Sequence, residues 1–136
     1  MSAIDITLPR VKMEEGFRGT SYKDTEGHTT IGYGFDVDAG ITEPEAAALV
    51  LAQLEERHNA LLAFTWYRQL DDVRQSVCLD MSFNLGLNGL LGFPHMIAAL
   101  ERQDWSSAAT ECHVNNPELT GRYAKLAQML LTGAVT

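Results

Sequence analysis

The stretch from residue 14 to residue 35, EEGFRGTSYKDTEGHTTIGYGF, constrains the fold of this chain most. It begins where a helical pattern ends, at Glu15, and continues into residues that favour strands and tight turns. Asp24 opens a turn, and the β-rich run 28–35 follows. In a hairpin, Thr30 would point back toward that turn. We therefore expect the end of a helix, a small hairpin or three-stranded sheet, and two carboxylates in one region of the fold.

The pattern of residues 5–15 predicts the first helix. Asp5 or Thr7 would cap it, and Pro9 fits its first turn. Glu15 then lies in the last turn, where the helix macrodipole is negative. A negative charge is disfavoured at that end of a helix, so the protonated form of Glu15 is favoured there.

The rest of the chain predicts helices. A capping box, Thr42-Glu43-Pro44-Glu45, begins a long helix that runs to about residue 62 and could link a β lobe to a helical lobe. The later helices are predicted as one capped by Asp71 or Asp72, one over residues 93–102, one capped by Asp104 and one over residues 121–132, with a turn over residues 84–89. The predicted fold is therefore α+β, mainly α, with one small sheet near the N-terminus.

The charge balance bears on the partners of the chain. The 136 residues carry a formal net charge of -8, from 10 basic and 18 acidic side chains. A protein that binds nucleic acid or an anionic membrane needs a basic face, so the composition argues against both classes. No apolar run approaches the roughly 20 residues that span a bilayer. We expect a monomer without a nucleic-acid partner and without membrane insertion.

The histidines and cysteines give little sign of metal or disulfide chemistry. The four histidines show no ligand spacing, so neither a metal nor another cofactor is expected. Cys78 and Cys112 lie in apolar helical surroundings without a Cys-x-x-Cys spacing, which predicts two buried thiols. A disulfide between them stays open.

Glu15 and Asp24 have the environments that glycoside hydrolysis needs. That reaction requires one acid to protonate the leaving oxygen and a second carboxylate that activates water or acts as nucleophile. Glu15, at a helix end, suits the proton donor, whereas Asp24, in a polar turn beside backbone N–H groups, is expected to stay ionised. Thr30 would hold a water between them. Two solvated acids nine residues apart are also common, and spacing alone leaves that alternative open.

Three segments of the stretch resemble the active-site region of the phage-type lysozymes, the T-even phage lysozyme family of muramidases. The segments are EEGFR, YKDTEG and TIGYG. The family pattern is Glu, eight residues, Asp, five residues, Thr, and it falls here on Glu15, Asp24 and Thr30. Later blocks resemble the family's core helix, the helices after it and its closing helix, so the likeness covers nearly all of residues 8–133.

The resemblance implies cleavage of the β-1,4 bond between N-acetylmuramic acid and N-acetylglucosamine in bacterial peptidoglycan. It implies Glu15 as general acid, Asp24 as the second catalytic carboxylate and Thr30 as the residue that positions the water. Members of the family invert the anomeric centre, which suits two carboxylates far enough apart to admit a water.

Four further residues are candidates for substrate binding or support. Arg122 matches the arginine that pairs with the catalytic glutamate in this family. Asn84 and Phe83 match positions that line the sugar cleft, although the asparagine would equally suit a helix cap and the phenylalanine ordinary core packing. His28 lies in the active-site turn, where it would contact substrate or stay solvated.

The resemblance also implies one lysozyme-like domain over residues 1–136, built from two lobes with the cleft between them. The β lobe would cover residues 16–41 and the linking helix residues 42–62. The helical lobe would cover residues 63–133 together with the first helix, residues 5–15.

Two other functions stay open. A lytic transglycosylase needs the acid but no water-activating carboxylate, so Asp24 with Thr30 argues against it. A non-catalytic wall-binding or scaffold domain on the same fold would have no chemical need for Glu15, Asp24 and Thr30 together.

The N-terminal residues bear on where the chain acts. They lack the apolar core of a secretory signal, so we expect a chain made in the cytoplasm. Its wall substrate lies outside the membrane, and an endolysin of this kind would reach it after holin-type release.

Overall fold

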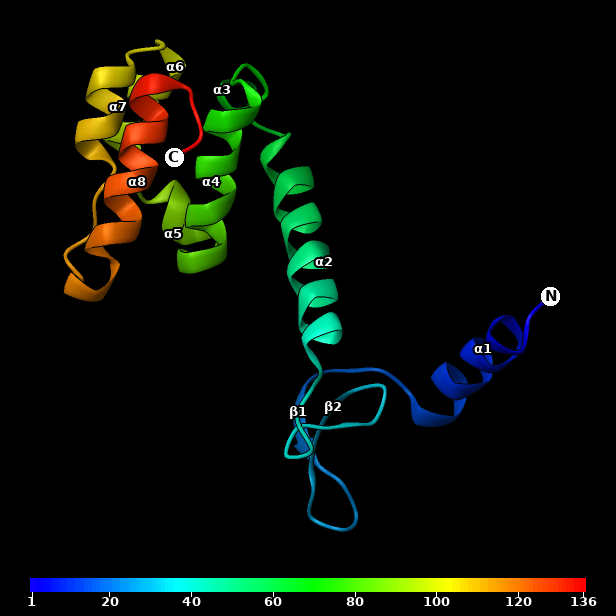
Figure 1. Ribbon diagram of the computed structural model, residues 1–136. Coiled ribbons are helices and arrows are strands. Elements are labelled where there is room, and N and C mark those ends of the chain that lie inside the picture. Colours follow the sequence, from blue (N-terminus) through cyan, green and yellow to red (C-terminus); the bar gives the residue numbers. More distant parts are fainter. The chain divides into compact units, whose positions relative to one another are not determined.

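A computed structural model describes residues 1–136 (Figure 1). The chain divides into two compact units, Met1–Ala48 and Leu49–Thr136. The first, here called the hairpin unit, contains the one sheet, and the second, the helical unit, contains helices without strands. A mainly helical chain with one three-stranded antiparallel sheet confirms the predicted α+β, mainly α fold.

The helices and strands follow one another as α1 (Ala3–Glu15), β1 (Arg18–Lys23), β2 (Thr29–Gly32), β3 (Phe35–Asp36), α2 (Glu43–Leu61), α3 (Thr65–Arg68), α4 (Asp72–Leu85), α5 (Leu87–Leu91), α6 (Pro94–Glu101), α7 (Trp105–Glu111), the 3-10 helix η1 (Pro117–Leu119) and α8 (Thr120–Thr132). α2 begins in the hairpin unit and continues into the helical unit. None of the helices is both long and apolar enough to cross a lipid bilayer. The lobe boundaries predicted above, with the first helix in the helical lobe, stay predictions.

The first helix begins earlier than predicted. Ser2 caps it, because the Ser2 hydroxyl accepts the N–H of Asp5 (3.1 Å) and the Asp5 carboxylate accepts the N–H of Ser2 (2.9 Å). This capping box replaces the expected caps at Asp5 and Thr7, and it leaves Pro9 inside the helix rather than in the first turn. The helix ends at Gly16, whose φ of 68° is costly for a residue with a Cβ.

The sheet places Thr30 at its centre. β2 is the middle strand, and β1 and β3 both pair with it antiparallel. Thr30 lies opposite Tyr22 of β1 and Asp36 of β3, and it is only 4% exposed. A residue paired on both sides has little freedom, so the sheet fixes Thr30 relative to both neighbouring strands.

One apolar core fills the helical unit. Each of its α-helices contributes at least one buried side chain, and the largest of these fit together without a buried polar atom left unpaired. The largest fully buried apolar side chains are Leu61, Tyr67, Val77, Met81, Leu90, Met96, Leu100, Tyr123 and Leu130. Their burial supplies the main driving force for folding this unit.

The turn predicted over residues 84–89 is present but much shorter than predicted. The chain turns only at Gly86, whose φ is 80°, and α5 begins at the next residue. α5 buries Leu90 completely, so tertiary packing stabilises a short helix that its local sequence does not favour. α3 was not predicted either, and it is likewise held by burial, of Trp66 and Tyr67.

Arg74 of α4 joins the ends of three helices. Its Nε donates to the carbonyl oxygen of Leu130 (2.8 Å) and its Nη2 to that of Leu131 (3.3 Å), in the last turn of α8, where carbonyls lack helical partners. Its Nη1 pairs with Asp71, the cap of α4 (2.8 Å), and its guanidinium carbon lies 3.8 Å from the ring centroid of Trp105, the first residue of α7. The side chain is 11% exposed, so these partners rather than water compensate its charge.

Cys78 and Cys112 are free thiols within the core, which confirms the predicted buried thiols. Burial raises the pKa of Cys78 to about 12, and the neighbouring thiol adds to the effect. Burial also raises the pKa of Cys112 to about 12, with a smaller contribution from the charge of Asp80. Both groups are therefore protonated and unreactive at neutral pH.

Arg74→Met is predicted to destabilise the helical unit by about 2–4 kcal/mol, because two helix-end carbonyls lose a buried donor. The measurement is the free energy of unfolding in urea, followed by tryptophan fluorescence, since Trp66 and Trp105 both lie in this unit. Arg102 offers the control, because it is 57% exposed and pairs with Asp104 at 3.4 Å. Arg102→Met is expected to cost less than about 0.5 kcal/mol. Equal losses in the two variants would contradict the role assigned to Arg74.

Candidate active site

The Glu15 carboxylate lies against the turn that joins β2 to β3. A Cβ added to Gly34 would collide with Oε2 of Glu15 and lie 3.0 Å from its Cδ. Gly34 also has a φ of 78°, which residues with a Cβ rarely adopt. The lack of a side chain at position 34 therefore leaves the space in which the carboxylate lies.

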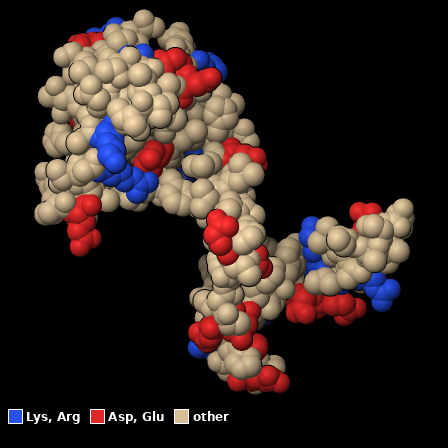
Figure 2. Space-filling view, viewed as in Figure 1, with Lys and Arg blue, Asp and Glu red and all other residues tan.

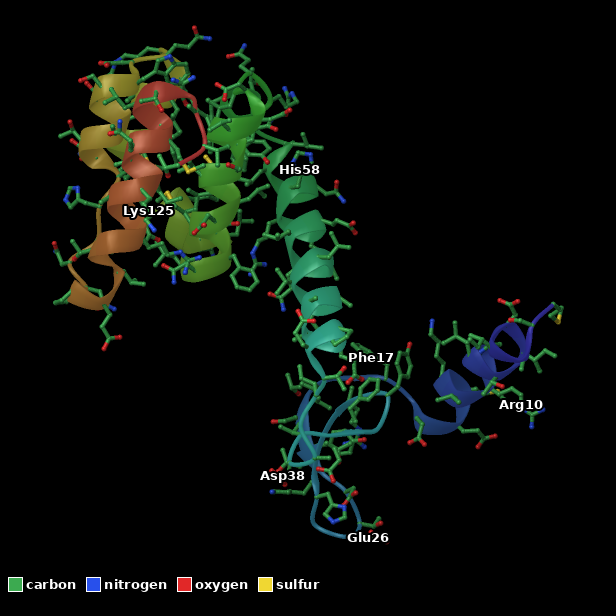
Figure 3. The ribbon with its side chains drawn as sticks, viewed as in Figure 1. Arg10, Phe17, Glu26, Asp38, His58 and Lys125 are labelled. Carbon is green, nitrogen blue, oxygen red and sulfur yellow. The ribbon has the colours of Figure 1, made fainter.

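Tyr33 joins the end of α1 to the same turn. Its ring centroid lies 5.5 Å from that of Phe17, and the Nζ of Lys12 lies 5.8 Å from the centroid. Figure 3 shows Phe17 where the chain leaves α1 and enters the hairpin. These contacts hold the end of the helix, and with it Glu15, beside the sheet.

Asp24 is held in its turn by backbone N–H groups. Its Oδ1 accepts the N–H of Glu26 (2.9 Å) and of His28 (2.8 Å), and its own N–H donates to the carbonyl oxygen of His28 (2.9 Å). The N–H of His28 does most to hold the pKa of Asp24 below its usual value, against the opposing effect of desolvation. Asp24 is therefore ionised at neutral pH, as its turn environment predicted. Figure 3 shows Glu26 at the tip of this turn.

The Thr30 hydroxyl points back to the Asp24 turn, as the hairpin predicted. Its Oγ1 donates to the carbonyl oxygen of His28 (3.1 Å). Because the N–H of His28 bonds the Asp24 carboxylate, two hydrogen bonds through one residue connect Thr30 to Asp24. No protein group donates to the hydroxyl, so its lone pairs are unpaired in the structure.

Carboxylates surround His28. Its Nδ1 lies 3.5 Å from Oδ2 of Asp24, and 4.0 Å from both Oε2 of Glu26 and Oδ2 of Asp36. Sequence reasoning missed Asp36, although a three-stranded register with Thr30 opposite Asp36 would have found it. Acidic side chains gather over the strands in Figure 2, while no group of three His, Cys, Asp or Glu side chains has an arrangement that could hold a metal ion.

Arg122, in the helical unit, pairs with Asp80 of α4. Its Nε and Nη2 each lie 2.7 Å from Oδ1 of Asp80. Sequence reasoning missed Asp80, because nothing in the local pattern of α4 indicates a partner 42 residues away. The predicted pairing of Arg122 with Glu15 would join the two units, and it stays a prediction.

Neither of the ordinary roles considered for Phe83 and Asn84 is observed. Phe83 is 40% exposed and lines an apolar hollow of about 310 Å³ on the helical unit, so core packing is wrong. Oδ1 of Asn84 accepts the hydroxyl of Tyr123 (2.9 Å), and Gly86 caps α4, so a helix-cap role for Asn84 is wrong. The predicted place of both residues in a sugar cleft stays a prediction.

Two comparisons with known proteins bear on the class of this chain. A family model described as Phage lysozyme matches residues 12–127, which include all the candidate site residues. A relative from Dictyostelium discoideum, named probable T4-type lysozyme 1, is 24% identical in an alignment that covers 92% of this chain and 93% of the relative. Together with the fold, these matches define a glycoside hydrolase that acts on peptidoglycan. The chain belongs to the phage lysozyme family, as its sequence pattern predicted.

Gly34→Ala is predicted to lower the rate of peptidoglycan cleavage about a hundredfold, because the new methyl group would displace the Glu15 carboxylate. The measurement is the release of soluble fragments from purified peptidoglycan, with circular dichroism to verify folding. Gly40→Ala is the matched control, since Gly40 has a φ of 80° and an added Cβ there meets no atom within 4 Å. Both variants carry the same backbone strain, so equal losses of activity would contradict the displacement.

Proposed function

We propose that this chain is a muramidase that cleaves the β-1,4 bond between N-acetylmuramic acid and N-acetylglucosamine, with Glu15 as proton donor and Asp24 as base. The contrast between these two carboxylates carries the proposal. Asp24 accepts two backbone N–H groups that favour its charged form, whereas the Glu15 carboxylate, at the end of α1, lies beside Gly34 in the turn between β2 and β3. Such a pair can supply one proton and accept another in the same reaction.

The two carboxylates would act together. Glu15 gives its proton to the glycosidic oxygen as the bond from that oxygen to the anomeric carbon of muramic acid breaks. A water held by Asp24 and Thr30 attacks the same carbon from the opposite face, and its proton passes to Asp24. The product has the inverted anomeric configuration, and proton exchange with solvent restores both carboxylates.

Glu15→Gln and Asp24→Asn are each predicted to slow wall lysis by about a hundredfold or more, while the protein stays folded. An asparagine at position 24 keeps an Oδ1 for the N–H groups of the turn, so its loss of activity would report chemistry rather than unfolding. The measurement is the turbidity of a peptidoglycan suspension, with thermal melting of each variant.

Glu14→Gln and Asp38→Asn are the matched controls, because each removes an exposed carboxylate near the site in sequence. Both controls are expected to lyse the wall at the rate of the unaltered chain. Substantial lysis by Glu15→Gln would contradict the assignment of Glu15 as proton donor. Substantial lysis by Asp24→Asn would contradict the assignment of Asp24 as base.

The type of reaction is read from the masses of fragments released from peptidoglycan. Fragments with reducing muramic acid ends are expected, and they support hydrolysis. Anhydro-muramic ends would instead assign a lytic transglycosylase. A folded protein that sediments with the wall and releases no fragments would favour a binding domain.

A muramidase must reach a wall that lies outside the cytoplasmic membrane. We propose that the chain acts as an endolysin after release through a holin-type pore. Lysis of cells from within only when such a pore is co-expressed would support this route.

A further inference from the structure

The two oxygens of the Asp24 carboxylate have different surroundings. Oδ1 accepts the N–H groups of Glu26 and His28, at 2.9 and 2.8 Å. Oδ2 faces the imidazole of His28, whose Nδ1 lies 3.5 Å away. An oxygen that already accepts two hydrogen bonds has little capacity for a third. Oδ2 is therefore the oxygen that remains to bind a water, and His28 lies beside it.

Carboxylates from the turn and from β3 face the same imidazole. Oε2 of Glu26 and Oδ2 of Asp36 each lie 4.0 Å from its Nδ1. Asp36 repeats the asymmetry of Asp24, because its Oδ1 accepts the N–H of Asp38 (2.9 Å) and its Oδ2 is directed at the histidine. A positive charge on the ring would thus be attracted by three carboxylates at once.

The basic side chains of β1 have partners of their own. Lys23 donates its Nζ to the hydroxyl of Thr29 (2.5 Å), and the guanidinium carbon of Arg18 lies 4.2 Å from the ring centroid of Tyr22. Neither forms an ion pair with Asp24 or Asp36. Among the basic side chains of this cluster, His28 is the one that lies beside Oδ2 of Asp24 and can gain or lose a positive charge.

We propose that His28 is a positioning residue for Asp24, and that protonation of its ring withdraws Oδ2 of Asp24 from the attacking water. The inference rests on the proposed function, because it assumes that Asp24 activates this water. It adds a pH-dependent control to the site, set by a residue that acts through Asp24 rather than on the substrate.

The direction in which the rate changes with pH follows from the contacts of Asp24. The backbone N–H groups of Glu26 and His28 do most to keep Asp24 ionised, so a positive charge on the His28 ring is not needed to create the base. A protonated Nδ1 needs to move only a few tenths of an ångström to donate to Oδ2, which occupies that oxygen and weakens it as a base. A neutral ring either carries its proton on Nε2 and leaves Oδ2 free, or donates from Nδ1 a hydrogen bond that is weaker because the ring has no charge. The rate should therefore rise with pH as the His28 ring loses its proton.

The first test follows the Asp24 carboxyl carbon by NMR as a function of pH, in the unaltered chain and in His28→Gln. The substitution keeps the backbone N–H to Oδ1 and removes the ring charge. The pKa of Asp24 is expected to rise by about 0.2–0.7 pH units, a small change because the ring of His28 is 52% exposed. His113→Gln, on an exposed histidine of the helical unit, is the control and should leave the Asp24 titration unchanged. An unchanged titration in His28→Gln would overturn the proposal.

The second test measures fragment release from purified peptidoglycan between pH 5 and 8. His28→Gln is expected to be about two- to fivefold faster than the unaltered chain at the acidic end and equal to it at the basic end. His28→Lys, with a permanent charge, should be slower by a similar factor at the basic end. A purely structural role would lower the rate of His28→Gln equally at every pH, and that result would overturn the proposal, as would an unchanged profile.

The two tests separate failure of the inference from failure of the proposed function. A chain that releases no fragments at any pH would refute the muramidase assignment. The NMR titration needs no substrate, so it still decides whether the His28 charge acts on Asp24.

Discussion

A single buried positive charge organises the helical unit. Apolar side chains fill its interior, but they do not satisfy the carbonyl groups at the end of α8 or the carboxylate that caps α4. Arg74 donates to those carbonyl groups and pairs with that carboxylate. It also lies over the ring of Trp105 at the start of α7. Gly133 leaves room for it, because an added Cβ there would lie 2.9 Å from Nη1 of Arg74. Since a buried guanidinium is stable only when every partner is present, the three helix ends depend on one another.

The hairpin unit is ordered by other means. Backbone hydrogen bonds close the turn around Asp24, and the sheet register fixes Thr30 between two strands. Contacts of Tyr33 with Phe17 and Lys12 hold the helix end beside the sheet. Asp24 and Thr30 therefore take their positions mainly from main-chain hydrogen bonds, whereas Glu15 takes its position from side-chain contacts at the end of α1. This suits a site that needs carboxylates in unlike environments, because N–H groups can be directed at one carboxylate and not at the other.

Features that depend on neighbours in the sequence were predictable. The turn at Asp24, the box that begins α2 at Thr42 and the cap of α4 at Asp71 all involve residues within four positions of each other. Ser2 was missed although its signal is local, because aspartate stands where a capping box usually has glutamate or glutamine. Contacts between distant segments left no local trace, and the pairs of Arg122 with Asp80 and of Tyr123 with Asn84 are the examples. The roles assigned to the site residues came from the family pattern, since geometry alone describes environments rather than reactions.

Gly34 also bears on how such a site can change over generations. Two separate demands act on this position, one from a backbone angle that disfavours side chains and one from the carboxylate that occupies the adjoining space. A relaxation of either demand leaves the other in force, so a side chain at position 34 is expected to cost stability, activity or both.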